Sequence, residues 1–207
     1  MSSLAAAPAA AWPASLTEGP VRLRPIRRRD WRAWNRLREA NRGWLEPWDA
    51  TSPASGSGPA NFPEYASGLL RQARAGQAWP WLIEYRGELA GQLTVAGITR
   101  GAQLSGTAGY WVAEELAGRE IAPTAVALAF DHAITAGELH RLEIAIRPEN
   151  RPSLRVAQKL GFRDEGLRLR YLHVAGAWRD HRVFALTRED APDGLMARWR
   201  AAGQPVK

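Results

Sequence analysis

Short stretches in which apolar and polar residues alternate predict the strands of a β-sheet along this chain. The clearest is RLEIAIRP at residues 141–148, where the aliphatic side chains from Leu142 onward all fall on one face. Two more strands flank the dipeptide Arg86-Gly87, which is typical of the turn of a β-hairpin. Four further strands are expected, at residues 21–26, 109–113, 168–174 and 181–187.

Apolar residues that recur every three or four positions predict helices between these strands. Residues 151–160 carry a start and a stop signal, because Pro152 favours the first helical turn and Gly161 the position after the last. A preceding helix has Pro123 in its first turn. Two more helices are expected earlier in the chain, one that follows Asp30 and reaches Leu45 and one at residues 64–75.

The segment at residues 51–63 is rich in Ser, Gly and Pro and is therefore predicted to be a loop. It lies between two predicted helices. Two interpretations are open for it: a flap on the substrate side of a site, or a passive connector.

The elements follow the order β, two helices, an antiparallel meander and β-α-β-α-β-β, which predicts a single mixed α/β domain. A length of 207 residues suits one such domain. We expect it to span residues 20–190, with an N-terminal tail at 1–19 and a C-terminal tail or short helix at 191–207. No apolar run reaches membrane-spanning length and the opening residues lack the basic start of a signal peptide, so we expect a cytoplasmic protein.

Composition and charge restrict the classes of function. The chain has no cysteine, which excludes disulfides and cysteine-based zinc or redox sites. Its four histidines lack the spacing of metal ligands, and we expect no metal. A formal net charge of +7 suits a polyanionic partner such as nucleic acid, a ribosome or a phosphate-rich cofactor, although a surface of solvated arginines would give the same balance.

Two junctions between a predicted strand and the helix after it could bind a ligand. At residues 109–130 the helix start carries small residues, and the free N–H groups and positive dipole end of a helix start suit a phosphate. At the second junction Asn150 is the expected N-cap and satisfies N–H groups near Ser153. Capping alone explains both of these residues, so the pattern leaves open whether they also touch a ligand.

Taken together, the two junctions resemble the two core motifs of the GNAT superfamily of acyl-CoA-dependent N-acetyltransferases. The second junction matches that family's Asn-x-x-small…Lys-x-Gly-Phe pattern at Asn150, Ser153, Lys159, Gly161 and Phe162. The stretches at residues 28–51 and 166–190 look like the branch that contains the ribosomal-protein alanine N-acetyltransferases. The resemblance covers about residues 20 to 190 in order.

This resemblance implies a fold, a cosubstrate and a set of contacts. The fold is a single domain with a central mixed, largely antiparallel sheet that splays between the strands at 109–113 and 142–147 and is flanked by helices. The pantetheine arm of acetyl-CoA would lie between these strands, and its pyrophosphate would bind the loop before the next helix. The implied cofactor contacts are Trp111, Val112, Gly118, Arg119, Glu120, Ile121, Ala122, Asn150 and Ser153.

The phosphate loop departs from the family pattern Gln/Arg-x-x-Gly-x-Gly/Ala, because its positions are Ala117, Glu120 and Ala122 here. Glu120 places a negative charge where the family has glycine. A carboxylate that points into the loop would cost a few kcal/mol at an effective dielectric constant of about 20, whereas one that points to solvent would cost little. We expect the solvent-facing orientation.

The catalytic groups are less clearly marked. Many relatives use a tyrosine at the position of Ala157, and we assign the acid role to Ser153 by its match to a serine in some ribosomal-protein acetyltransferases. Relatives carry the base at positions that match Ala145 or Leu172, neither of which can act here. Glu143 is our candidate base and Glu84 a second one. Each also suits an ordinary salt-bridged role, and a water relay without a dedicated base stays open.

We therefore expect an acetyl-CoA-dependent N-acetyltransferase that acts on the N-terminal α-amino group of a protein, such as a ribosomal protein. The neutral amine would attack the thioester directly, and a backbone N–H near Val112 would polarise its carbonyl. Two alternatives stay open: a small-amine acceptor such as an antibiotic or polyamine, and a basic ribosome- or RNA-associated protein without catalysis. The sequence leaves open whether the protein forms a homodimer.

Overall fold

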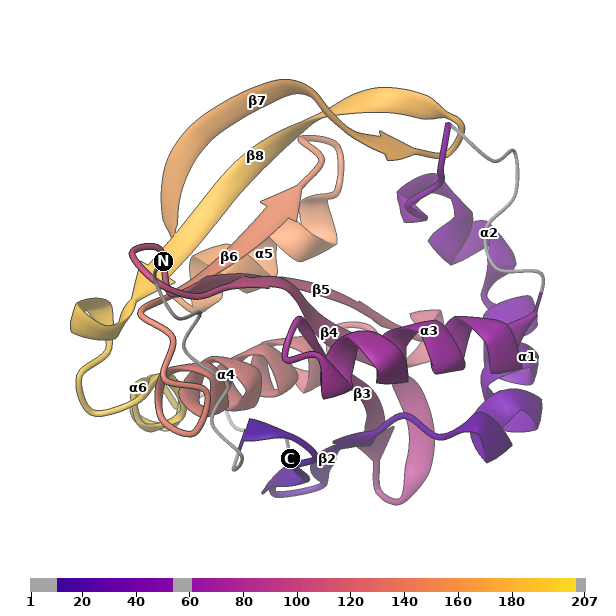
Figure 1. The fold of residues 1–207 in the computed structure, drawn as a ribbon, viewed down its shortest axis with the longest axis horizontal. Helices are drawn as coiled ribbons and strands as arrows, with labels where there is room; N and C mark the ends of the chain where they lie inside the picture. Colours follow the sequence, from indigo (N-terminus) through magenta and orange to yellow (C-terminus); the bar gives the residue numbers. More distant parts are fainter. Residues whose placement is uncertain (1–10, 54–60, 204–207) are drawn as a thin grey trace.

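The computed structural model describes residues 11–53 and 61–203, which form an eight-stranded sheet with helices on both faces (Figure 1). The strands are β1 Leu16–Glu18, β2 Val21–Pro25, β3 Ala78–Tyr85, β4 Glu88–Thr99, β5 Ser105–Val112, β6 Arg141–Ile146, β7 Arg163–Val174 and β8 Ala177–Thr187. Their spatial order is β1-β2-β3-β4-β5-β6-β8-β7, and every neighbouring pair is antiparallel except β5 and β6. The predicted mixed α/β class with a largely antiparallel sheet is confirmed.

The sheet splays between its two parallel strands. β5 and β6 pair only at their first residues, from Ser105↔Arg141 to Thr107↔Glu143. Beyond this point β5 continues its pairing with β4, and β6 with β8, so that the two strands part (Figure 1). This is the splay that we expected, and it leaves backbone groups of both strands without a partner strand.

Helices cover the two faces of the sheet. Side chains alternate along β3, so Trp81 and Ile83 pack on the side of α4 while Leu82 packs on the side of α3. Most residues of α4 are buried, because it lies between the sheet and α6. The helices are α1 Trp31–Ala40, α2 Arg42–Leu45, α3 Phe62–Arg74, α4 Ile121–Ile134, α5 Arg151–Lys159 and α6 Leu195–Ala201.

Several strands are longer than predicted. β5 begins at Ser105, four residues before the expected start. The prediction missed these residues because they are small and show no apolar alternation. β7 and β8 begin at Arg163 and Ala177. The pairing of β7 with β8 is irregular between Asp164 and Leu167 and again before Leu172. Each irregularity shifts side chains from one face to the other and so obscures the period of two.

The first long helix that the sequence predicts is divided at Asn41 into α1 and α2. The Asn41 side chain is buried; its Nδ2 donates to the Leu37 carbonyl at 2.9 Å, and its Oδ1 accepts from the Glu114 N–H at 2.7 Å. This second bond ties the helix pair to the turn that precedes α4, which is the turn of the expected phosphate loop.

Both ends of the chain extend the folded unit past the expected boundaries at residues 20 and 190. Within the expected tail at 1–19, β1 pairs with β2 and the Ala14 carbonyl accepts from Trp81 Nε1 at 2.8 Å. At the other end α6 packs against α4 and buries Leu195 and Trp199. In both segments apolar side chains find room in the core. None of the helices in the described ranges combines the length and hydrophobicity needed to cross a membrane.

Most of the loop expected at residues 51–63 lies outside the described residues. The choice between a flap and a passive connector concerns this same segment. Its two ends are described. The Thr51 N–H donates to the His173 carbonyl at 2.9 Å, and Asn61 caps α3 through a bond from the Glu64 N–H at 2.9 Å.

Candidate active site

Two cavities adjoin where β5 and β6 part. The larger, here called the main cleft, has a volume of about 380 Å³ and is lined by residues 110–112, the turn and first residues of α4, and one face of α5. The smaller, here called the strand gap, has about 160 Å³ and is lined by residues 108–110 and 144–147. Trp48, Tyr110, Asn150 and Ser153 line both cavities and so mark their junction.

The start of α4 forms one end of the main cleft. Gly118 has a φ of 78°, a left-handed value that glycine adopts easily, and the chain then enters the helix at Ile121. The first N–H groups of a helix have no acceptor within it, so Ile121 and Ala122 present free donors at a positive dipole end. This end of the cleft can bind an anion.

Glu120 is the N-cap residue of α4 and pairs with Lys159 at the end of α5, with 2.5 Å between Oε1 and Nζ. Its side chain is 22% exposed. The expected solvent-facing orientation of Glu120 is therefore wrong, because the ammonium group of Lys159 holds its carboxylate across the end of the cleft. Glu120 also has a left-handed φ of 60°, which explains why a glycine would suit this position.

Asn150 performs the capping role that the sequence predicts. Its Oδ1 accepts from the Ser153 N–H at 3.1 Å at the start of α5. This bond leaves the side-chain NH₂ group as the part of Asn150 that could donate to a ligand in either cavity.

Tyr110 lies beside Ser153 at the junction of the cavities, and the sequence did not single it out. Burial raises the pKa of Tyr110 well above its ordinary value, an effect that the neighbouring Ser153 hydroxyl partly opposes. The phenol therefore stays protonated at neutral pH. Two hydroxyl groups, from β5 and from α5, thus meet where the cavities join.

The other expected cofactor contacts fall mainly where the resemblance implies. Those that line the main cleft are Trp111, Val112, Gly118, Glu120, Ile121, Ala122, Asn150 and Ser153. Arg119 is exposed and is absent from this lining. The carbonyl of Val112 accepts from Trp44 Nε1 at 3.2 Å. Trp44 and Trp48 both line the cleft.

The two carboxylates considered as bases lie elsewhere. Glu143 Oε1 accepts from Arg141 Nε at 2.7 Å, and Glu143 lines neither cavity. Glu84 accepts from Arg24 Nε at 2.5 Å on β3, three strands away from β6. The structure gives each of them an ion-pairing role and does not bring either to the junction.

Three side chains that the sequence did not assign to the site complete it. Arg155 and Lys159 lie one turn apart on α5 and bring positive charge to the main cleft. His181 enters the wall of the strand gap from β8. The spacing of the two cations was visible in the sequence, whereas nothing near His181 in the chain connects it to β5 or α5.

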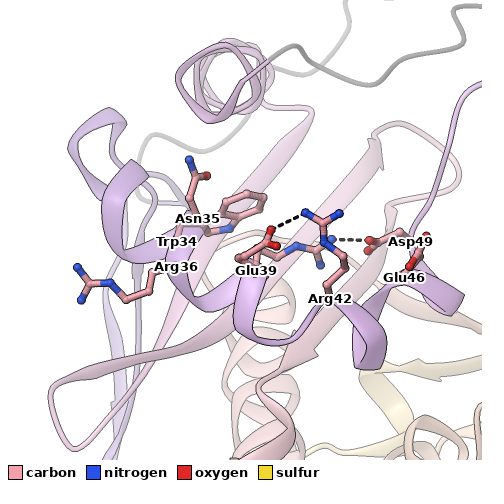
Figure 2. A pocket seen from close by; sticks show the side chains of 8 residues that line it. Trp34, Asn35, Arg36, Glu39, Arg42, Glu46 and Asp49 are labelled. Atoms are coloured by element: carbon pink, nitrogen blue, oxygen red, sulfur yellow. Dashed lines mark hydrogen bonds and ion pairs between the residues drawn. The ribbon is translucent and has the colours of Figure 1, made fainter.

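A third cavity, the outer groove, lies along α1, α2 and the turn Glu46–Trp48 and has a volume of about 720 Å³. Figure 2 shows its charged lining, in which Arg42 pairs with Glu39 while Arg36 points away. Asp49 is paired with Arg38. Asp49 also lines the main cleft, so the two cavities are neighbours. Across the described part of the chain, no three metal-ligating side chains gather into a cluster.

A profile of the family described as the acetyltransferase (GNAT) domain matches residues 21–163 of this chain. The chain belongs to the GNAT acetyltransferase family. The matched segment runs from β2 to the start of β7 and includes β5, α4 and α5, which line the main cleft, and β6, which lines the strand gap. The family that we inferred from the two strand-to-helix motifs is thus confirmed.

Similar proteins include several named for ribosomal-protein acetylation. The solved structure of Mycobacterium smegmatis RimJ in complex with CoA-disulfide is 44% identical, with a TM-score of 0.87 over 94% of this chain and 97% of that one. The Escherichia coli ribosomal protein uS5-alanine N-acetyltransferase is 26% identical over 86% of this chain and 93% of that protein. The probable N-acetyltransferase YjcK of Bacillus subtilis is 35% identical, but the match spans 49% of this chain and 56% of YjcK.

Proposed function

We propose that this GNAT acetyltransferase transfers the acetyl group of acetyl-CoA to the N-terminal α-amino group of a ribosomal protein, in the cytoplasm. The observation that carries the proposal is the near full-length similarity to a relative named as a ribosomal-protein alanine N-acetyltransferase. It spans 86% of this chain and is therefore not confined to the cofactor motifs.

The main cleft has the chemistry that acetyl-CoA requires. Acetyl-CoA, when bound, supplies an acetyl thioester as the acyl donor. Apolar side chains predominate along the cleft, the start of α4 offers free N–H groups, and Arg155 and Lys159 add positive charge beside it. The negative charge of Glu120 is already neutralised by Lys159, so it does not prevent an anion from binding there.

The junction residues would perform the proton chemistry. In this proposal Ser153 Oγ holds the proton that the leaving group takes up, and the protonated Tyr110 hydroxyl beside it supports that role. The backbone N–H groups near Val112 polarise the carbonyl oxygen. Glu143 stays an untested candidate base, although its bond to Arg141 favours a structural role.

The outer groove favours an extended acceptor over a small amine. It adjoins the main cleft at Asp49 and continues along α1 and α2 for a volume of about 720 Å³. A peptide whose first residue lies at the junction could place its next residues there, with the Glu46 carboxylate available to its backbone N–H and basic groups.

A panel of acceptors tests this function. Purified protein would be given acetyl-CoA with N-terminal peptides of ribosomal proteins, with the same peptides carrying a blocked N-terminus, and with polyamines and aminoglycosides. Release of free thiol measures transfer. We expect free N-terminal peptides to exceed every small amine by orders of magnitude, with blocked peptides inactive. Faster turnover of a small amine would move the acceptor to that class.

A further inference from the structure

His181 is a buried side chain in the wall of the strand gap, with 4% of its surface exposed. The pairing Ile146↔Arg182 sets it beside the end of β6, on the same sheet face as Val183, whose partner is Ala145. The small side chain of Ala145 leaves this face of the gap open next to the imidazole ring.

The hydrogen bond of the ring fixes its tautomer. His181 Nδ1 lies 3.0 Å from the carbonyl oxygen of Arg179. Because a carbonyl oxygen can only accept, Nδ1 carries the hydrogen and the neutral ring has its lone pair on Nε2. In residues 11–53 and 61–203, no hydrogen bond to Nε2 is found.

The groups around the ring keep it neutral. Burial lowers the pKa of His181 and the charge of Arg147, the residue after β6, lowers it further, while the Arg179 carbonyl, Glu149 and Asp180 oppose the shift. On β7, Arg168 is opposite His181 in the strand pairing, and the Tyr171 ring packs edge-on at 6.1 Å between centroids. The net direction is downward, so the ring is unprotonated near neutral pH.

The strand gap offers few other groups that could accept a proton. Its titratable lining consists of Tyr110, Arg147 and His181 among the residues that the structure describes. The phenol and the guanidinium are both protonated at neutral pH, and neither can act as a base there. Ser153 and Asn150, which the gap shares with the main cleft, have no basic group either.

We propose that His181 Nε2 is the general base that takes the proton from the acceptor's α-ammonium group, an assignment that rests on the proposed function. The N–H bond of the ammonium breaks, its electron pair stays on nitrogen as the nucleophile's lone pair, and the proton binds Nε2 to form an imidazolium. That proton then passes to water. A base on β8 replaces those that relatives carry at the positions of Ala145 or Leu172.

The first test reads the ring itself in the wild-type protein without any substrate. Nitrogen chemical shifts of the imidazole, followed by NMR against pH, report the tautomer and the titration of His181. We expect hydrogen on Nδ1 and a pKa below the ordinary histidine value of about 6.5. Hydrogen on Nε2, or a pKa above that value, would overturn the proposal.

The second test uses the pH dependence of acetyl transfer to an N-terminal peptide by wild type and His181→Gln. We expect a loss of about 10²-fold in kcat near neutral pH. The deficit should shrink above about pH 8, where the α-amino group is already neutral without help. A deficit that stays constant across this range would indicate a structural role and overturn the assignment.

Controls separate this proposal from the proposed function. His140→Gln, on the surface beside Glu189, should leave the pH profile unchanged. Free imidazole should restore part of the activity of His181→Ala. Asp49→Asn is tested in parallel with His181→Gln. If Asp49→Asn loses kcat near neutral pH while His181→Gln retains it, Asp49 is the base and the proposal fails. Wild type that acetylates no peptide would contradict the proposed function instead, and the NMR measurement would still decide the state of His181.

Discussion

Glu120 and Lys159 join the start of α4 to the last turn of α5 through an ion pair with 2.5 Å between Oε1 and Nζ. The pair spans 39 residues of sequence and lies at the end of the main cleft where an anion would bind. Its two members have opposite effects on an anionic ligand, so substitutions can separate them.

Replacement of Glu120 by glycine should strengthen the binding of acetyl-CoA by about 3- to 10-fold, because one negative charge leaves the anion site and Lys159 is released toward the ligand. Isothermal titration calorimetry measures this change. Folding stability should change little, since relief of the left-handed φ, about 1 kcal/mol, offsets the loss of a partly exposed ion pair.

Two further variants are matched to this one. Glu120→Gln removes the charge but keeps the side chain, and it should reproduce most of the gain in affinity. Lys159→Ala should weaken binding. If Glu120→Gly binds acetyl-CoA no better than wild type, the carboxylate has no influence on the anion site.

Asn150 offers a way to distinguish capping from ligand binding. Asn150→Ala removes the cap of α5 and should cost about 1 kcal/mol of unfolding free energy, whereas Asn150→Ser keeps an acceptor oxygen and should cost little. Both variants lack the NH₂ group, so both should weaken acetyl-CoA binding. Urea denaturation and calorimetry measure the two effects, and full affinity in Asn150→Ser would show that the cap is the whole role of this residue.

Ser153 and Glu143 can be compared directly as catalytic candidates. Ser153→Ala should lower kcat by about 10²-fold and leave the Kd for acetyl-CoA within about 3-fold, because a proton donor is lost while the cleft is preserved. Glu143→Gln should leave kcat nearly unchanged and reduce stability by up to about 1 kcal/mol, because Arg141 loses a charged partner. A large loss of kcat in Glu143→Gln would restore it as the base.

Acid should destabilise the fold through carboxylates paired with arginine. Bonds from Arg141 hold the pKa of Glu165 below its ordinary value, and a backbone bond from Thr187 does the same for Asp190. A carboxyl group whose pKa is lower in the folded than in the unfolded state stabilises the fold. This stabilisation is complete when the pH is above the pKa of the unfolded state, and it is lost as the pH falls through the pKa of the folded state.

The urea midpoint should therefore hold from neutral pH down to about pH 4.5 and fall below it. Glu165→Gln and Asp190→Asn should each have a lower midpoint than wild type at neutral pH and a shallower decline in acid. An equally steep decline in both variants would assign the acid sensitivity to other groups.

The sequence alone determined the elements whose signals are local. The helix α5 is predicted between Asn150 and Gly161 and observed at Arg151–Lys159, because an N-cap and a C-terminal glycine act within one turn of the chain. The strand β6 follows in the same way from its alternation. The family, the fold class and most of the cofactor contacts that we expect rest on these two elements and on the start of α4.

Only the tertiary structure decided which distant groups line the two cavities together. Glu120 turns toward Lys159 rather than solvent, and His181 reaches the strand gap because β8 pairs with β6. The last part of β7 was predicted at residues 168–174, but its first residues, 163–167, were missed because the strand is irregularly paired and mostly exposed. Periodicity tells which face a side chain occupies, but not which distant strand or helix lies beside it, because that choice depends on packing and pairing across the whole chain.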